Sequence, residues 1–191
     1  MVEKLANIIV SQMEEEKLLN CKIREHYVYA LVIMIEKWVT IISIISLSII
    51  YGQFIPTILF CLFFLSLRKR TGGYHAEKFW QCYLETIVTY ILIIFVCSTL
   101  VEYMNIVYIF LAGSIILISI IGTVNHPNMA MDELEIQGSK SATRYLLCLE
   151  CMVILAAIIL NVCEICICYM SMAIILCAIL ISIAKIVKQE V

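Results

Sequence analysis

Residues 68–86 of this 191-residue chain contain the side chains best suited to chemistry. Cys82 follows a cationic cluster in this window, and His75 precedes it by seven residues. A cysteine attacks as a thiolate, which is favoured by positive potential, by a helix N-terminus or by a histidine partner. Because a helix is expected to begin just after the glycines at 72–73, Cys82 can have all three. The pattern therefore indicates a cysteine nucleophile with His75 as its base.

The spacing of this pair restricts its geometry. Seven residues of helix are two turns, so both side chains would face the same way but lie about 10.5 Å apart along the axis. Helical side chains also lean toward the N-terminus, which turns His75 away from Cys82. A catalytic pair therefore requires His75 to lie on the flexible glycine turn and fold back, or requires one residue from each of two subunits. Two structural residues that never meet are the alternative.

Charged residues flank this pair on both sides. Four basic residues are of the kind that fixes the orientation of a membrane protein: Arg68, Lys69, Arg70 and Lys78. On the other side, Glu85 lies three residues after Cys82 and could orient His75 as a third member of the site. A snorkelling acid at the membrane boundary is the alternative role of Glu85.

The elements that position these residues belong to a membrane protein. The chain is 63% hydrophobic and 15% charged, with a mean hydropathy of +1.03, which excludes an ordinary soluble globule and a disordered chain. A net charge of -2 does not indicate a nucleic-acid partner. The opening segment mixes both charge signs, so a removable signal peptide is not expected. Most of the ten cysteines are expected to pack between helices, because they lie in apolar runs.

Hydropathy predicts about six hydrophobic helical segments. A bilayer core of about 30 Å needs about 20 apolar residues in a helix. Four runs meet this requirement: Tyr83–Val101, Ile106–Val124, Tyr145–Cys163 and Ile165–Ala184. The region before them predicts a shorter helical pair, 27–51 and 54–67, and the second helix, only about 21 Å long, either crosses fully or enters the bilayer and returns. We therefore predict an all-α polytopic membrane protein.

The basic residues predict how the chain is oriented. Twelve of the 13 Lys and Arg residues fall on alternate loops or at the termini, and the positive-inside rule makes these loops cytoplasmic. Both termini and the 68–82 catalytic boundary region are therefore expected on the cytoplasmic face. Residues 1–25 predict an amphipathic helix, either on the membrane surface or solvated, ahead of the membrane segments within 27–184. We expect a single domain, 1–191.

The window resembles the accessory gene regulator B (AgrB) family of bacterial quorum-sensing membrane peptidases. The matching positions are Arg68, Gly73, His75-Ala76, Phe79-Trp80, Cys82-Tyr83 and Glu85-Thr86. A weaker match is the loop 123–135, which departs from the family's commoner Pro- and Lys-rich form. The length, the N-terminal helix and the expected cytoplasmic termini also agree, so the resemblance covers nearly the whole chain.

The resemblance implies that His75 and Cys82 are the catalytic dyad of a cysteine endopeptidase that needs no cofactor. It also implies that Arg68 and Gly73 shape the site. The substrate would be a small AgrD-like pro-peptide with an amphipathic leader and an acidic C-terminal tail, which the basic cluster would bind. The expected product is a cyclic thiolactone intermediate of an autoinducing peptide. The protein would act in the bacterial cell membrane, in contact with lipid, and the resemblance admits a homodimer.

A non-enzymatic transporter or channel subunit is the alternative function. Its path would use the ionisable residues inside apolar segments: Glu36, Lys37 and Glu150. No repeat or matching pair of broken helices favours that function. Two cysteine motifs could bind a metal or pair oxidatively, Cys148-x-x-Cys151 and Cys163-x-x-Cys166-x-Cys168. Neither has the further ligands of a closed zinc site on the same side, so no metal is predicted.

Overall fold

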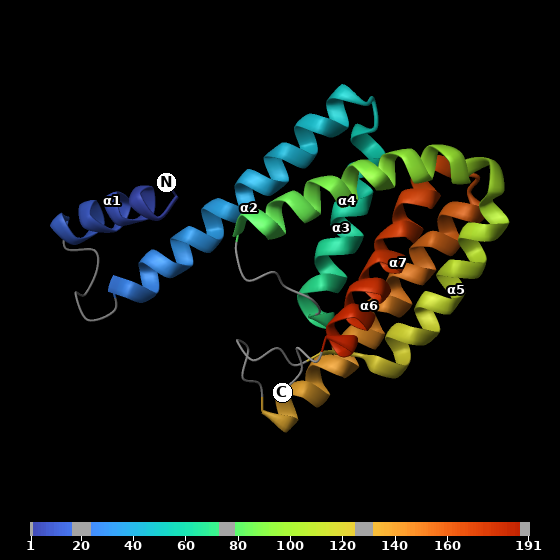
Figure 1. The fold of residues 1–191 in the computed structure, drawn as a ribbon. Coiled ribbons are helices and arrows are strands. Elements are labelled where there is room, and N and C mark those ends of the chain that lie inside the picture. Colours follow the sequence, from blue (N-terminus) through green and yellow to red (C-terminus); the bar gives the residue numbers. More distant parts are fainter. Residues whose placement is uncertain (1, 17–23, 73–78, 125–131, 188–191) are drawn as a thin grey trace.

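The computed structural model describes residues 2–16, 24–72, 79–124 and 132–187. Within these ranges the chain is helical and contains no strand (Figure 1). The helices are α1 (Val2–Glu15), α2 (Arg24–Ile50), α3 (Phe54–Thr71), α4 (Phe79–Leu100), the short 3-10 helix η2 (Val101–Tyr103), α5 (Met104–Ile121), α6 (Glu133–Ile159) and α7 (Glu164–Ile186). The predicted all-α architecture, with a helix ahead of about six hydrophobic ones, is confirmed.

Four helical stretches in the described part of the chain are long and apolar enough to cross a membrane. They are α2, the continuous run Trp80–Ile121 through α4 and α5, α6, and α7. The three basic residues in the last turn of α3 leave that helix outside this set. Apolar helices of this length are stable in lipid because their backbone hydrogen bonds are satisfied internally. The chain is therefore a membrane protein.

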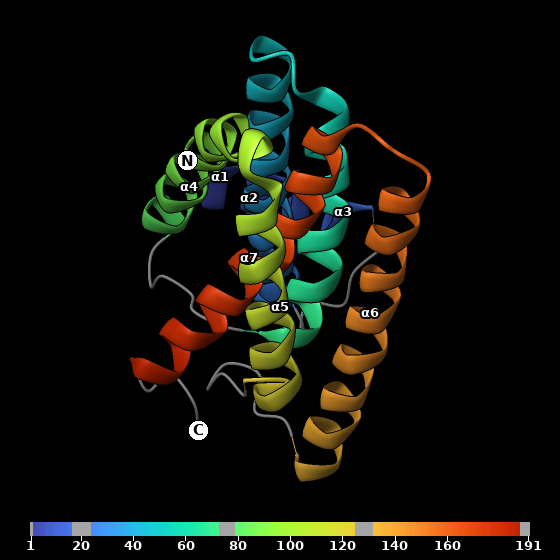
Figure 2. The ribbon, with the colours of Figure 1, turned by 90° about the vertical axis from the view of Figure 1, so that its right-hand side faces the viewer.

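Helix α7 is the centre of the bundle. Its buried side chains run along most of its length, and α3 and α5 pack along it most extensively (Figure 2). Ile174 and Ile181 of α7 are fully buried, in one cluster with Leu67 of α3 and Ile118 of α5. Burying a large aliphatic side chain stabilises a fold by roughly 1.5–3 kcal/mol. This core therefore fixes the position of the end of α3 along α7.

Helix α3 is longer than the sequence predicted. The predicted helix 54–67 ends at the basic cluster, whereas α3 continues through that cluster to Thr71. Lysine and arginine are good helix formers, so a charged turn does not end a helix. The helix stops at Gly72, whose φ of 65° is in the left-handed region that favours glycine. At 18 residues, α3 is about 27 Å long, close to the thickness of the bilayer core.

Helix α6 differs from the predicted span Tyr145–Cys163 at both ends. It begins at Glu133, because Asp132 and Glu135 form a capping box on its first turn. It ends at Ile159, and Asn161, with a φ of 51°, turns the chain toward α7. Cys163 therefore lies outside α6 and is the N-cap residue of α7.

Helix α1 packs on α2, beside which it folds back in Figure 1. Ala6 and Val10 of α1 are fully buried. The Arg24 guanidinium, at the start of α2, donates hydrogen bonds to Glu14 and Asn7 of α1, each at 3.2 Å. The predicted N-terminal helix is confirmed as a helix. Its place on the membrane surface stays a prediction.

Two isoleucines of α7 test the central core. Ile174→Ala should lower the free energy of unfolding by about 2–5 kcal/mol, because it leaves a cavity in close-packed surroundings. Ile179→Ala is the matched control, since this side chain is 48% exposed and its loss should cost less than about 1 kcal/mol. Unfolding in mixed detergent micelles, followed by circular dichroism, measures both. Equal losses for the two variants would contradict the packing described here.

Candidate active site at the end of α3 and the start of α4

The end of α3 is joined to the end of α5 and the start of α6. The Val124 amide donates a hydrogen bond of 2.9 Å to the carbonyl oxygen of Thr71. The Ser139 hydroxyl on α6 donates one of 3.2 Å to the carbonyl oxygen of Arg70. Thr123 lies within hydrogen-bonding distance of Thr143, at 3.3 Å. These bonds hold the last turn of α3, and with it the point where the chain leaves toward residues 73–78.

Gly72 is the last described residue before this departure. A Cβ atom at this position would lie 2.7 Å from the carbonyl oxygen of Val124, which real Cβ contacts essentially never show. Its own carbonyl oxygen accepts a hydrogen bond from the Arg68 guanidinium. Close approach and positive φ therefore both require glycine here. The next residue, Gly73, was predicted to shape the site, but it lies outside the described residues, as do His75 and Lys78.

Arg68 differs from the two basic residues that follow it. Its side chain is half-buried, whereas Lys69 and Arg70 are exposed. Burial lowers the pKa of the Arg68 guanidinium, whereas the nearby thiols of Cys177 and Cys82 raise it. Because the pKa of arginine ordinarily exceeds about 12, the guanidinium stays charged at neutral pH. The helix α3 therefore directs one fixed cation into the bundle and two toward its surface.

Cys82 lies in the first turn of α4 and is half-buried. Its carbonyl oxygen accepts a hydrogen bond of 2.7 Å from the Thr86 hydroxyl. The neighbouring Tyr83 hydroxyl lies 3.0 Å from the hydroxyl of Ser43 on α2. A hydrogen bond between helices in an apolar environment contributes about 0.6–2 kcal/mol. Helix α2 therefore positions the start of α4, where Cys82 lies.

Among the residues that the structure describes, three charged side chains lie within electrostatic range of the Cys82 thiol. Arg68 comes from α3 and Glu85 from α4, and both belong to the sequence window around Cys82. Glu36 comes from α2, is half-buried, and is a charged neighbour that the sequence analysis did not place near Cys82. The sequence shows Glu36 as a charged residue inside an apolar run. The hydropathy pattern alone cannot place that residue near Cys82. Within the described part of the chain, one cation and two carboxylates on three different helices therefore lie within electrostatic range of the thiol.

The residues considered for a transport path have separate surroundings. Glu150 of α6 is buried, and one of its carboxylate oxygens accepts a hydrogen bond of 2.7 Å from the Ser66 hydroxyl on α3. Glu36 lies near Cys82, and Lys37 is exposed. Among the residues that the structure describes, no hydrogen bond or ion pair joins these three ionisable residues into one path.

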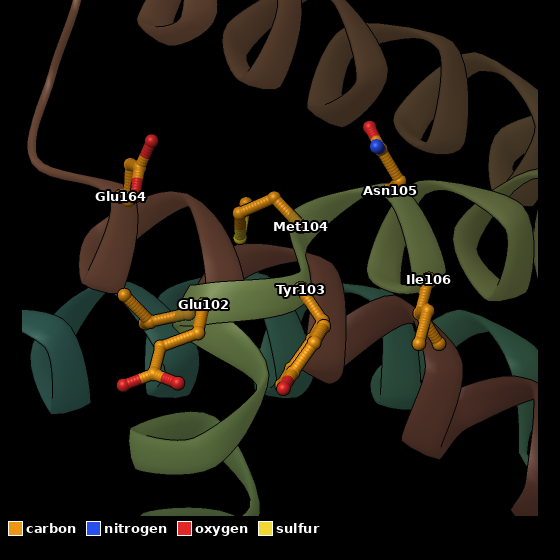
Figure 3. A pocket seen from close by; sticks show the side chains of 7 residues that line it. Glu102, Tyr103, Met104, Asn105, Ile106 and Glu164 are labelled. Atoms are coloured by element: carbon orange, nitrogen blue, oxygen red, sulfur yellow. The ribbon is translucent and has the colours of Figure 1, made fainter.

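A pocket of about 540 Å³ lies at the other end of the bundle, at the turn between α4 and α5 (Figure 3). Its lining comes from that turn and from the first residue of α7: Val101, Glu102, Tyr103, Met104, Asn105, Ile106 and Glu164. None of the described site residues named above lines it. Over the described ranges, no group of three or more His, Cys, Asp and Glu side chains is arranged to hold a metal ion.

Comparison with known proteins gives one match. The family model described as accessory gene regulator B matches residues 2–187, nearly the whole chain. No curated protein and no solved structure matches.

The hydrogen bond between the Val124 amide and the Thr71 carbonyl oxygen can be tested with a substitution at Gly72. Gly72→Ala should lower the free energy of unfolding by roughly 1–3 kcal/mol, because the new methyl group meets a backbone oxygen at positive φ. Hydrogen exchange at the Val124 amide should accelerate as that oxygen moves. Gly113→Ala is the matched control, since its Cβ would meet nothing within 4 Å. Unchanged exchange at Val124 in Gly72→Ala would show that the contact does not hold the end of α3.

Proposed function

We propose that this chain, which belongs to the accessory gene regulator B family, is a membrane cysteine endopeptidase that makes a thiolactone intermediate. Membership involves the chain in the processing of quorum-sensing peptides. The finer proposal is carried by one observation, the Cys82 thiol at the start of α4 within electrostatic range of the half-buried Arg68 guanidinium. The positive charge of Arg68 favours the thiolate that attacks a carbonyl carbon, whereas burial of the thiol and the carboxylates of Glu85 and Glu36 oppose it.

The proposed substrate is a small AgrD-like pro-peptide with an amphipathic leader and an acidic tail. The ends of α3, α5 and α7 and the start of α6 lie at the same end of the bundle (Figures 1 and 2). That end carries exposed or half-buried cations: Lys69, Arg70, Lys140, Arg144 and Lys185. Complementary charge attracts and orients an acidic peptide segment. This arrangement supports binding of the tail at that end, with the leader in the membrane interface.

Cleavage would begin at the junction between the signal region and the tail. The Cys82 thiolate attacks the carbonyl carbon there, and His75 takes the thiol proton and then delivers it to the leaving amine. The bond to the amine breaks, and the tail departs. The leader and signal region remain on Cys82 as a thioester.

Cyclisation would follow without an energy source. An internal cysteine of the peptide attacks the thioester carbonyl, a new thioester forms within the peptide, and Cys82 regains its thiol. One thioester replaces another, so the exchange is nearly neutral in free energy. The intermediate must be kept from water, and a site at the membrane boundary can exclude it.

The charged neighbours of Cys82 fit this sequence of steps. The Arg68 guanidinium favours the negative charge that develops on the sulfur and on the carbonyl oxygen. The carboxylates of Glu36 and Glu85 favour the positive charge of the His75 imidazolium and of the leaving amine. We assign Glu36 and Glu85 as positioning residues, and Arg68 as the residue that stabilises developing charge.

The distribution of basic residues supports an orientation in which the basic end of the bundle faces the cytoplasm. With the basic end of the bundle in the cytoplasm, as the positive-inside rule requires, both termini and the site share that side. A homodimer stays a prediction, and it would offer a second way to bring His75 to Cys82.

Replacement of the nucleophile tests the peptidase. The substrate should be encoded in a short neighbouring reading frame for an amphipathic peptide that contains cysteine. When that peptide is co-expressed, Cys82→Ala should reduce its processing at least about a thousandfold, because no acyl-enzyme can form. Cys61→Ala, which removes another half-buried thiol, should leave processing near the wild-type level. Mass spectrometry of the peptide products measures both, and normal processing by Cys82→Ala would refute the proposal.

Substitutions at two arginines of α3 should distinguish an effect on the chemical step from an effect on substrate binding. Arg68→Gln should lower kcat by about 100-fold, because it removes the charge beside the reacting atoms. Arg70→Gln should chiefly raise KM, because this exposed side chain would contact only the tail. Steady-state kinetics in proteoliposomes give both constants. Arg68→Lys, which keeps the charge, should retain more of the wild-type kcat than Arg68→Gln. Equal losses of kcat in the two variants would instead indicate a purely structural role for Arg68.

A further inference from the structure

Helix α6 carries a buried acid to which the proposed peptidase assigns no role. Glu150 is 3% exposed, and it lies in a helix that is apolar enough to cross a membrane. No ion pair joins it to a basic side chain in the part of the chain that the structure describes. Its Oε2 atom is buried there without a hydrogen-bond partner. An ionisable group is costly at such a position, and groups retained there usually have a function.

The other carboxylate oxygen of Glu150 joins α6 to α3. It accepts a hydrogen bond of 2.7 Å from the Ser66 hydroxyl, which also lies 3.0 Å from the carbonyl oxygen of Phe63 in its own helix. A helical side chain leans toward the N-terminus of its helix. The Glu150 side chain therefore extends toward the end of the bundle where α6 begins and α3 ends, which is the end that carries Arg68 (Figures 1 and 2).

The order of residues in the last turns of α3 connects Ser66 to Arg68. Leu67, between them, is fully buried in the core around α7. Successive helical residues are about 100° apart around the axis, so Ser66 and Arg68 lie on opposite sides of the Leu67 contact. Ser66 meets α6 on its side, and Arg68 lies within electrostatic range of Cys82. A rotation of α3 that broke the bond to Glu150 would therefore also move the Arg68 guanidinium.

A thiol of α7 lies beside the same turns of α3. Cys177 is fully buried, and its Sγ atom lies 3.9 Å from the carbonyl oxygen of Phe64. This thiol is within electrostatic range of both Arg68 and Glu150. The acid and the guanidinium therefore belong to one region of the bundle, although they come from different helices.

We propose that Glu150 is a positioning residue, which holds the rotation of α3 through Ser66 and so directs the Arg68 guanidinium toward Cys82. This inference rests on the proposed peptidase, in which Arg68 stabilises developing negative charge. The hydrogen bond does the positioning, because the acid has no ion pair among the described residues. A misplacement of about 1 Å at a reacting group can lower a rate by about 100-fold. Loss of this bond should therefore slow the chemical step without weakening substrate binding.

Substitution of Glu150 by leucine removes the bond with little change in side-chain volume. Replacing a buried polar group by an apolar one of similar size is often neutral for stability, and Ser66 keeps the Phe63 carbonyl oxygen as its partner. The unfolding midpoint in detergent should therefore stay near the wild-type value. In Glu150→Leu we expect kcat to fall about tenfold, while KM changes by less than about twofold.

Three further variants isolate the hydrogen bond. Glu150→Gln should keep kcat within about twofold of wild type, because its amide oxygen still accepts from Ser66. Ser66→Ala removes the same bond from α3 and should lower kcat as much as Glu150→Leu does. Glu102→Gln is the matched control for loss of an acid, since this residue is exposed at the other end of the bundle. It should leave kcat unchanged.

A second readout separates this proposal from the peptidase itself. Mass spectrometry of the purified full chain in detergent measures how fast iodoacetamide alkylates Cys82. Because the Arg68 charge favours the thiolate, Arg68→Gln should slow alkylation about tenfold and Glu150→Leu about threefold, whereas Glu150→Gln should react as wild type. When Arg68→Gln is already present, adding Glu150→Leu should have no further effect, because Glu150 acts through Arg68.

An unchanged alkylation rate in Glu150→Leu would overturn the proposal. Equal slowing by Glu150→Leu with and without the Arg68 guanidinium would overturn it as well, and so would a loss in Glu150→Gln as large as that in Glu150→Leu. These alkylation rates do not depend on peptide processing. They therefore decide the role of Glu150 even if Cys82→Ala shows that the proposed peptidase is wrong.

Discussion

The packing of α3 along the buried helix α7 is the constraint from which the site follows. Leu67 is fully buried in the cluster that includes Ile181 of α7, so the last turn of α3 cannot rotate freely. The next residue, Arg68, is thereby held half-buried, within electrostatic range of Cys177 on α7. In lipid, a guanidinium is costly unless it has partners. Its hydrogen bond to Gly72 and its place near Cys82 are therefore parts of the same packing.

Hydroxyl pairs set how α2, α3 and α4 fit together. Tyr83 pairs with Ser43 of α2, and Tyr90 of α4 lies 2.6 Å from the Thr57 hydroxyl of α3. Apolar surfaces alone do not select one register between helices in a membrane, because lipid and leucine are equally apolar. Polar pairs can, since each misplaced hydroxyl loses its partner. The pair between Tyr83 and Ser43 therefore holds α2 against the start of α4, and this contact places Glu36 of α2 near Cys82.

Hydropathy predicted the apolar parts of the helices and missed their charged ends. Helix α3 extends past residue 67 and α6 begins before Tyr145, because Lys, Arg and Glu continue a helix as readily as Leu. The sequence could indicate the group of residues around Cys82, because these residues are close together along the chain. It could not indicate the approach of Glu36, because helix pairing depends on contacts between distant segments. The same limit applies to Cys163, whose role as the N-cap of α7 follows from a turn at Asn161 that no apolar pattern indicates.

The central claim is that Cys82 carries the peptide as a thioester, and a trapping experiment tests it most directly. A pro-peptide whose internal cysteine is replaced by alanine can be cleaved but cannot cyclise. Intact-mass spectrometry of the protein in proteoliposomes should then show an adduct equal to the leader and signal region. Neutral hydroxylamine should remove that adduct, and digestion should place it on Cys82. Release of the tail without an adduct, or an adduct on another residue, would contradict the account.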